Sequence, residues 1–255
     1  DFENKWNDIK IVLEYGMLSE PKFYEKAGDF VLYPTTDNKY YTLDELKNAI
    51  KDKQTDKNGK TVVLYASNKE AQHSYIDIAK EKGYEVLLLD SPIVSHLIQK
   101  LEQDNENLTF VRVDADHIDK LIEKEENQIS KLSDDEKEKL KASLEEFVPK
   151  TTYTIQLEAM DSNAAPFMIT QPEFMRRMKE MSATGGGMFG MGNFPDMYNL
   201  VVNTNSELAS SILNAEKSVQ ESLVKQALDL AKISQGLLKG EELTAFVKRS
   251  FELIK

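Results

Sequence analysis

A glycine-rich run is one segment of this chain whose residue types and spacing could carry chemistry. Gly185-Gly-Gly187-Met-Phe-Gly190 satisfies the pattern Gly-x-Gly-x-x-Gly, in which the backbone approaches the pyrophosphate of a dinucleotide. Such a site needs a strand before the pattern and a helix after it. Here a predicted helix precedes the pattern and Pro195 follows it, so we expect a loop that uses the backbone freedom of glycine.

Metal chemistry would need ligands at short, regular spacing. The three histidines, His73, His96 and His117, are too far apart in sequence to form a metal-binding pair on one helix, and the chain has no cysteine. We therefore expect each histidine to be solvated or satisfied by protein groups, and we expect no metal site.

Two polar residues follow apolar runs that resemble strands. Ser67 and Asp90 each come directly after such a run, at the position where sites of α/β proteins often lie. No glycine elbow frames Ser67, and Asp90-Ser-Pro is also a pattern that caps a helix. Capping is the preferred interpretation of Asp90, while a small-molecule enzyme with its site near these residues stays open as an alternative.

The strongest signal is a concentration of methionine. Eight of the nine methionines lie between Met160 and Met197, and methionine side chains can repack around differently shaped partners. A helix predicted from Gln171 to Ser182 places Phe174, Met178 and Met181 on one face, with Met175 beside them.

That apolar face allows two interpretations. It could pack as core against Met160 and Met168, which we expect to lie in or beside strands. The following loop, however, adds Met188, Phe189, Met191 and Phe194 without regular structure that would bury them, and such loops often mark an interaction site. We therefore predict a surface that binds apolar segments loosely.

Composition limits the partners of this surface. The 255-residue chain is 40% hydrophobic and 30% charged, with a net charge of −12, which disfavours nucleic acid and anionic membranes as partners. No apolar stretch approaches the roughly 18 residues of a membrane span, and the absence of cysteine fits a reducing compartment. We expect a cytoplasmic protein. Because the chain opens on Asp1 inside a helical pattern, we also expect it to be part of a longer protein.

The first half of the chain alternates helices with apolar strands. Thr42 and Glu45 form a capping-box pattern, and two continuously apolar runs joined by a helix predict a parallel βαβ unit. We predict a small three-layer α/β module over residues 1–130. Its expected helices cover 2–15, 20–27, 42–51, 68–82 and 92–101, and its expected strands cover 61–66, 85–89 and 109–113.

The second half has a different pattern. A charged stretch contains a second capping box, Ser133 with Glu136, and we predict a linker and connecting helix over 131–150. Residues 151–255 then form an α+β domain with a short sheet and long C-terminal helices. Its expected strands cover 153–157, 167–169 and 198–202.

The C-terminal helices carry more apolar residues than a small domain can cover. Their stripes must be buried, so we expect a helical bundle formed with a second copy of the chain. The residues predicted to form this dimer interface are Leu223, Ala227, Leu228, Leu230, Ala231, Leu243, Phe246 and Val247.

Several segments together resemble the ninety-kilodalton heat-shock chaperone family. The resemblance rests on Trp6 and the run Val12-Leu-Glu-Tyr-Gly16, on Val63-Leu-Tyr-Ala-Ser67, on Lys82-Gly-Tyr-Glu-Val-Leu-Leu-Leu-Asp90 and on Asn199-Leu-Val-Val-Asn203. It covers nearly all 255 residues in order. At the last segment the chain lacks the proline and histidine that end the family's strand.

The resemblance implies a division of roles. Residues 1 to about 130 would be the smaller part of the family's middle domain, and the rest would be its dimerisation domain. ATP and Mg²⁺ would bind upstream, so we expect no cofactor and no ATP hydrolysis here. Non-native client proteins would contact the helix from Gln171 to Met181, the loop residues Met188 and Phe189, and His96, which occupies an aromatic position of the family. A scaffold for one fixed partner remains a second alternative.

Overall fold

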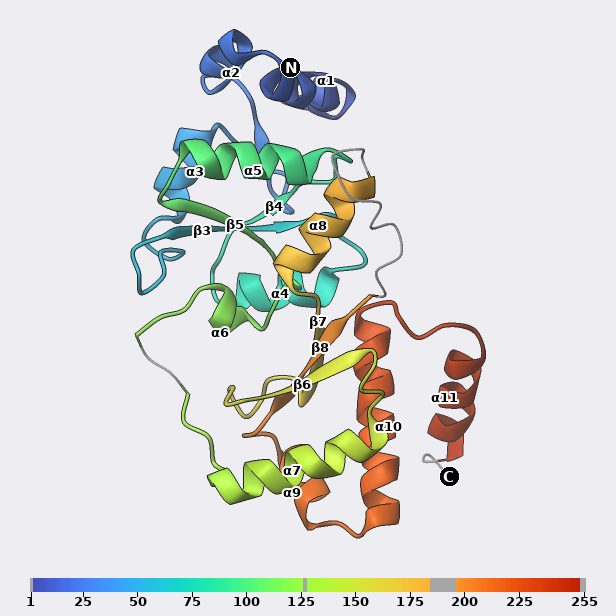
Figure 1. Cartoon of the computed structure of the whole chain (residues 1–255). Helices are drawn as coiled ribbons and strands as arrows, with labels where there is room; N and C mark the ends of the chain where they lie inside the picture. Colours follow the sequence, from blue (N-terminus) through green and yellow to red (C-terminus); the bar gives the residue numbers. More distant parts are fainter. Residues whose placement is uncertain (1, 126–127, 184–195, 253–255) are drawn as a thin grey trace. The chain divides into compact units, whose positions relative to one another are not determined.

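The computed structural model describes residues 2–125, 128–183 and 196–252 (Figure 1). The described residues form two compact units, the first from 2–125 and 172–183 and the second from 128–171 and 196–252. A short segment therefore packs with the first unit although its neighbours along the chain belong to the second.

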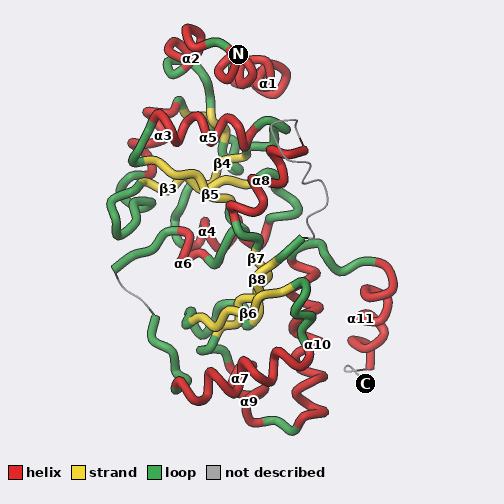
Figure 2. The backbone as a smooth tube through the Cα atoms, in the orientation of Figure 1, coloured by secondary structure: helices red, strands yellow, loops and turns green. Residues whose placement is uncertain are grey.

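The first unit is built around a three-stranded parallel sheet of order β4-β3-β5 (Figure 2). Its elements are η1 (Glu3–Lys5, a 3-10 helix), α1 (Trp6–Ser19), α2 (Pro21–Ala27), β1 (Tyr33–Pro34), β2 (Tyr40–Tyr41), α3 (Leu43–Ile50), β3 (Thr61–Ala66), α4 (His73–Glu81), β4 (Val86–Leu88), α5 (Val94–Asp104), β5 (Leu108–Arg112), α6 (Ile118–Leu121) and α8 (Glu173–Ala183). The predicted βαβ unit is confirmed, because β3 and β4 pair in parallel and α4 joins them.

The helices of this unit cover both faces of the sheet. Helices α3 and α5 lie on one face, and α4 and α6 lie on the other (Figure 1). The core contains fully buried Trp6, Tyr65 and Phe110, with Leu97 and Ile98 from α5. Continuous burial along β3 explains its uninterrupted apolar sequence, since both faces of a parallel sheet are covered.

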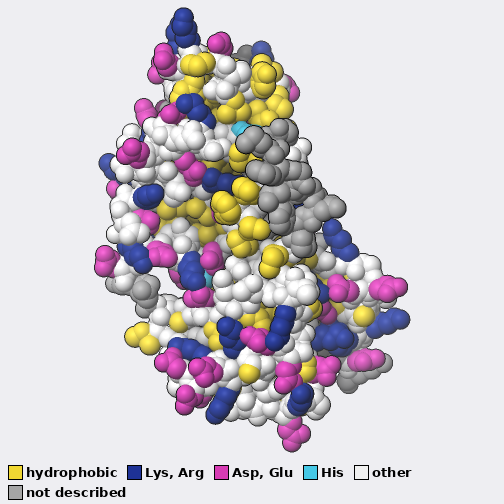
Figure 3. Space-filling model, in the orientation of Figure 1, with side chains coloured by type: hydrophobic (Ala, Val, Ile, Leu, Met, Phe, Trp, Pro, Cys, Tyr) yellow, Lys and Arg dark blue, Asp and Glu magenta, His cyan; other side chains and the backbone are white. Residues whose placement is uncertain are grey.

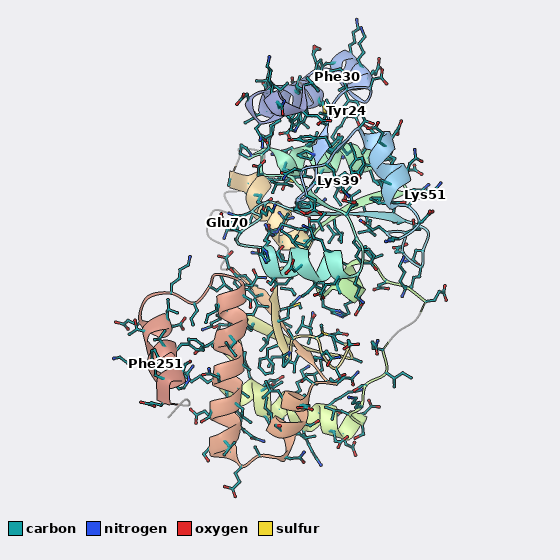
Figure 4. The ribbon with its side chains drawn as sticks, turned by 180° about the vertical axis from the view of Figure 1, so that it is seen from behind. Tyr24, Phe30, Lys39, Lys51, Glu70 and Phe251 are labelled. Carbon is teal, nitrogen blue, oxygen red and sulfur yellow. The ribbon has the colours of Figure 1, made fainter. Side chains whose placement is uncertain are left out.

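The N-terminal helices pack onto the same core. The rings of Phe23 and Phe30 meet edge to face with centroids 5.9 Å apart. The Lys100 ammonium of α5 lies 4.5 Å from the centre of the Tyr24 ring, and both Tyr24 and Phe30 are seen from behind in Figure 4. A cation over an aromatic face is an attractive arrangement that helps to fix α2 against α5.

The second unit contains a mixed three-stranded sheet of order β6-β8-β7. β6 pairs with β8 in parallel, and β7 pairs with β8 antiparallel. Its elements are α7 (Asp134–Phe147), β6 (Tyr153–Glu158), β7 (Phe167–Thr170), β8 (Tyr198–Asn203), α9 (Glu207–Asn214), α10 (Lys217–Ser234) and α11 (Gly240–Glu252). Mixed α and β structure in both units agrees with the predicted fold class.

The packing departs from the expected division of residues at two places. Leu140 and Leu144 of α7 are buried in the core of the second unit, so this helix is more than a connection between domains. Helix α8, which the sequence places within the domain 151–255, packs with the first unit because its charged side chains find partners there.

Both predicted capping boxes are confirmed. The Thr42 side chain accepts from Glu45 N while the Glu45 carboxylate accepts from Thr42 N, and Ser133 and Glu136 form the same pair of hydrogen bonds. These bonds satisfy orphan amides at the first turn of each helix. Within the described parts of the chain, no helix combines the length and the apolar character that a membrane span requires.

Candidate functional site

Helix α8 carries two unlike faces. Phe174 is 70% exposed, and Met175 and Met178 are each 43% exposed, whereas Arg176 on the opposite side is only 4% exposed. Met181 is partly buried. The space-filling view shows hydrophobic side chains gathered over α8 (Figure 3). The helix is therefore attached to the first unit through a charged face and leaves its methionine and phenylalanine face accessible.

The centre of the charged face is a three-residue cluster. The Tyr65 hydroxyl of β3 donates to the Glu173 carboxylate at 3.0 Å and accepts a hydrogen bond from Arg176. Arg176 also donates to Glu173 at 2.5 Å, and its guanidinium lies 5.7 Å from the centre of the Tyr65 ring. Charge-assisted hydrogen bonds of this kind are short and directional, so they define the rotation of the helix.

A second cluster ties α8 to α5 and β5. Arg177 donates through two nitrogens to the two oxygens of Glu102, at 2.7 and 3.2 Å, and it also donates to the Phe110 carbonyl. Glu102 itself accepts from Phe110 N at 2.7 Å. The carboxylate is thus held by the β5 backbone while it receives the forked guanidinium of the helix.

The last turns of α8 make a further set of contacts. The Glu180 carboxylate accepts from Arg176 at 2.6 Å and from the Ser95 hydroxyl of α5 at 2.5 Å. Its Oε1 also lies 3.6 Å from Arg112, which forms a two-bond ion pair with Asp114. The charged face therefore contacts the first unit along most of the helix.

Burial and charge shift the titration of this network. Burial is the largest single influence on the pKa of Glu173 and raises it, but Arg176 and Arg177 together outweigh burial and hold that pKa below its usual value. Burial, followed by the Glu173 charge, raises the pKa of the Tyr65 hydroxyl. Both groups consequently keep the protonation states that the hydrogen bonds require at neutral pH.

The remaining predicted client-contact residues have different locations. His96 lies on α5, the helix beside α8, and it is partly buried. Met188 and Phe189 fall outside the described residues, as does the glycine pattern Gly185–Gly190. Met160 and Met168 are buried, as predicted, although Met160 lies just beyond the end of β6.

The predicted dimer-interface residues divide into two groups. Ala227, Leu228 and Ala231 of α10 are buried in the second unit's own core, although Ala227 and Ala231 also line an apolar surface groove. Helix α10 packs against β7, α7 and α9. The accessible residues are Leu230, Leu243 and Val247, which are exposed, together with Leu223 and Phe246, which are partly buried.

The accessible residues of α10 follow a regular spacing. Val219, Leu223, Gln226, Leu230 and Ile233 recur at intervals of four and three, which is the spacing of a helix–helix seam. Leu230 is 51% exposed. Leu223 and Leu230 also line an apolar groove of about 310 Å³ beside the start of β7.

Helix α11 lies against α10 through polar contacts. Arg249 donates to Asp229 at 2.7 Å and to Gln226 at 2.8 Å, while Lys232 pairs with Glu242 at 3.1 Å. Phe251, labelled in Figure 4, is exposed near the end of α11. The contacts leave apolar residues of both helices on the surface.

The residues considered for catalysis occupy structural roles. Asp90 pairs with Lys10 at 2.5 Å, and helix α5 begins at Val94 without a side-chain cap, so the capping interpretation of Asp90 is wrong. Ser67 N donates to Gln72 Oε1 at 2.8 Å. The first helix after β3 therefore begins at His73, since residues 67–72 form a turn around Gln72.

The histidines are separated in the structure as they are in sequence. His73 is exposed on α4 with Nδ1 3.9 Å from Asp77, and His117 is buried before α6. Among the described residues, no cluster of three or more His, Asp or Glu side chains could hold a metal ion.

Sequence reasoning missed the residues that hold α8. Tyr65 and Glu102 carry no local signal for such a role, because their partners lie 108 and 75 residues away along the chain. The spacing of Glu173, Arg177 and Glu180 at i, i+4 and i+7 is a visible signal of a charged helix face. That stripe indicates a polar surface but does not identify what it meets.

Comparison with known proteins gives the family. A scan against protein-family models finds no match. The chain is similar to proteins named Chaperone protein HtpG, with 36% identity to the one from Bacteroides thetaiotaomicron over an alignment 321 positions long, covering 99% of this chain and 47% of the relative. The relative from Bacteroides fragilis strain YCH46 is 37% identical with the same coverage, and that from Porphyromonas gingivalis strain W83 is 43% identical over 245 residues, covering 94% of this chain and 35% of the relative.

The chain spans about half the length of the Bacteroides relatives and 35% of the length of the Porphyromonas relative. In each case the match extends over nearly all of this chain. Agreement at this level over both units confirms the resemblance found in the sequence. This chain belongs to the HtpG chaperone family.

Proposed function

We propose that this chain is part of a cytoplasmic, ATP-dependent chaperone that binds non-native proteins through the outward face of α8 and forms a homodimer through α10 and α11. ATP and Mg²⁺ would act in a part of the longer protein outside these residues, and the chain itself would hydrolyse no ATP. The relatives from Bacteroides and Porphyromonas are named as chaperone proteins, which supports a chaperone role.

One observation carries the client-binding proposal. Phe174, Met175 and Met178 remain exposed although α8 is firmly docked by its opposite face. An apolar helix face normally points into the core, so a helix that buries arginines and exposes methionines has the reverse arrangement of an ordinary surface helix. Unbranched methionine side chains suit such a face to partners of varied shape.

Weak contacts at one site suit this role. Binding one unfolded segment must order both the segment and the side chains that meet it, which removes much of the gain from apolar burial. Two copies of α8 in a dimer would raise the effective concentration of the second site once the first is occupied. A paired arrangement would therefore hold a client firmly enough while each contact stays easy to release.

The dimer proposal rests on the outer seam of α10. Its core-facing residues, such as Leu228, are already buried, whereas Leu230 and Val219 form a second apolar stripe on the surface. Leu243 and Val247 add an exposed stripe with the same spacing on α11. Apolar seams on two neighbouring helices are suited to a bundle with the same helices of a second copy.

The proposal is tested by suppression of client aggregation. Phe174→Asp with Met178→Asp should lower the capacity of the chain to prevent aggregation of a heat-denatured protein, measured by light scattering. Val12→Asp is the matched control, since Val12 is 68% exposed on α1 and the change is of the same kind. Equal suppression by the double variant and the control would remove α8 from the mechanism.

Dimerisation has a separate test. Leu230→Asp with Leu243→Asp should lower the molar mass of the chain in light scattering, while Ser211→Asp on the exposed side of α9 should not. A wild-type chain that is monomeric at micromolar concentration would contradict the dimer proposal and leave client binding by α8 open to its own test.

A further inference from the structure

The charged face of α8 is built to fix the direction of its apolar face. Glu173, Arg177 and Glu180 recur at i, i+4 and i+7, and Phe174, Met178 and Met181 recur at the same spacing one residue later. One residue along a helix corresponds to a rotation of about 100°. Any rotation that hid the apolar face against the first unit would therefore also break the charge pairs.

We propose that Tyr65 and Glu102 are positioning residues for client binding, which hold α8 docked on the first unit in the orientation that binds unfolded chains. The docked helix is then the active form, and a client is captured without α8 leaving this surface. The client part of this inference rests on the proposed function, whereas the docking part does not.

Glu102 is held by β5 independently of its contacts with α8. Its Oε1 accepts from Phe110 N at 2.7 Å and from the Thr109 hydroxyl at 3.3 Å, both on β5. The carboxylate consequently has one preferred direction, and Arg177 meets both of its oxygens. A forked guanidinium bound to a fixed carboxylate defines orientation as well as proximity.

The charge pairs that dock α8 are largely shielded from water. The side chains of Arg176, Arg177, Glu173 and Glu102 are between 4% and 24% exposed. Partly buried pairs are screened little by salt, and removal of one partner leaves the other charge less fully compensated. Tyr65 adds a neutral hydroxyl that bridges Arg176 and Glu173 from the middle strand of the sheet.

The chain offers a direct test because it has no cysteine. Ser95→Cys with Glu180→Cys places two thiols at facing positions of α5 and α8, where the Ser95 hydroxyl and the Glu180 carboxylate now meet through the longer glutamate side chain. A short reagent that bridges two thiols then locks α8 in its docked position. The locked chain is expected to suppress aggregation of a heat-denatured protein at least as well as the same chain with its thiols capped singly, in which the Glu180 contacts to Arg176 and Ser95 are absent.

Glu102→Gln tests the positioning residue itself. Since a charge-assisted hydrogen bond is worth about one decade in an equilibrium constant, we expect amide hydrogen exchange in α8 to rise on the order of tenfold, with weaker suppression of aggregation. Locking with the Ser95–Glu180 bridge should restore suppression to the Glu102→Gln chain. Glu106→Gln, an exposed acid nearby, is the matched control and should change neither measurement.

The outcomes separate the two ideas. If the locked chain loses suppression while the singly capped chain keeps it, clients bind an undocked helix. If amide exchange in α8 is unchanged in Glu102→Gln, Glu102 does not hold α8. Either result overturns the inference. If Phe174→Asp with Met178→Asp leaves suppression unchanged, the proposed function fails while the exchange measurement still decides the docking. Should Glu102→Gln fail to fold, the locked chain alone decides whether docking is compatible with capture.

Discussion

Truncation of the exposed face of α8 gives a prediction whose size follows from the structure. Burying a phenylalanine or methionine side chain completely is worth about 1.5–3 kcal/mol. Phe174 is 70% exposed, which leaves about 1–2 kcal/mol to be gained on contact with a client, and Met178 at 43% exposed leaves about 0.6–1.3 kcal/mol. Phe174→Ala with Met178→Ala should therefore weaken client binding by about 1.6–3.3 kcal/mol, or about 15- to 250-fold in Kd.

Alanine suits this comparison for two reasons. It is the strongest helix former, so α8 should stay helical, and both positions lie away from the charged face that docks the helix. The entropy lost when the client is ordered is shared by the wild-type and variant chains. The difference in Kd then reports the lost contacts.

The assay is fluorescence anisotropy of a labelled, reduced and carboxymethylated lactalbumin, which stays unfolded without heating. Val12→Ala is the matched control, because Val12 is 68% exposed on α1 and its loss should change Kd less than about twofold. A loss below about threefold in the double variant, or an equal loss in the control, would refute the assignment of this face to client contact.

Three further predictions concern stability, assembly and pH. Leu228→Ala should lower the free energy of unfolding by about 2–5 kcal/mol in urea denaturation, because Leu228 is buried. Leu230 is exposed, so Leu230→Asp should instead lower the molar mass in light scattering and leave the circular dichroism spectrum unchanged. The reverse pattern would contradict the orientation of α10. The pKa of Glu173 is held below its usual value of 4.5, so the ionised carboxylate should stabilise the docked helix at neutral pH and lose this effect as pH falls below 4.5 through the lowered pKa. Amide exchange in α8 that already rises between about pH 7 and about pH 6 would contradict this pH dependence. Burial raises the pKa of Glu14 above 4.5, so the ionised carboxylate lowers the stability of the fold at neutral pH. Glu14→Gln should therefore raise the melting temperature at about pH 7 and give no such gain below about pH 4, and a melting temperature lowered at both pH values would contradict this reasoning.

Much of the fold could be predicted because its signals are local. The apolar run Thr61–Ala66 is the strand β3, since a strand covered on both faces needs no polar alternation. The capping boxes at Thr42 and Ser133 depend on residues three positions apart, so their hydrogen bonds can be inferred without knowledge of the fold.

The ends of helices are less predictable where a side-chain hydrogen bond or a change of backbone conformation ends a helix while the apolar spacing of the sequence continues. The helix expected to begin near residue 68 begins at His73, because Gln72 accepts hydrogen bonds from the backbone of Ser67 and Asn68. The apolar intervals of three and four run on through Ala215, although the backbone there is extended and separates α9 from α10.

The candidate site was predicted only in part for a physical reason. The spacing of Phe174, Met175 and Met178 indicates one apolar face, and the structure places all three at the surface. Which way a face points depends on what the opposite face meets, and the partners of Arg176 and Arg177 come from strands and helices far away in sequence. For the same reason the sequence does not show that Leu228 is buried in the core of the second unit while Leu230 is exposed.

The most direct test of the account places a reporter on α8 itself. With no native cysteine, Phe174→Cys and Val12→Cys can each carry one environment-sensitive fluorophore at positions of similar exposure. Addition of an unfolded protein should shift the emission of the label at position 174 to shorter wavelength and leave the label at position 12 unchanged. An unchanged signal at position 174, or equal shifts at both positions, would contradict the claim that the outward face of α8 binds clients.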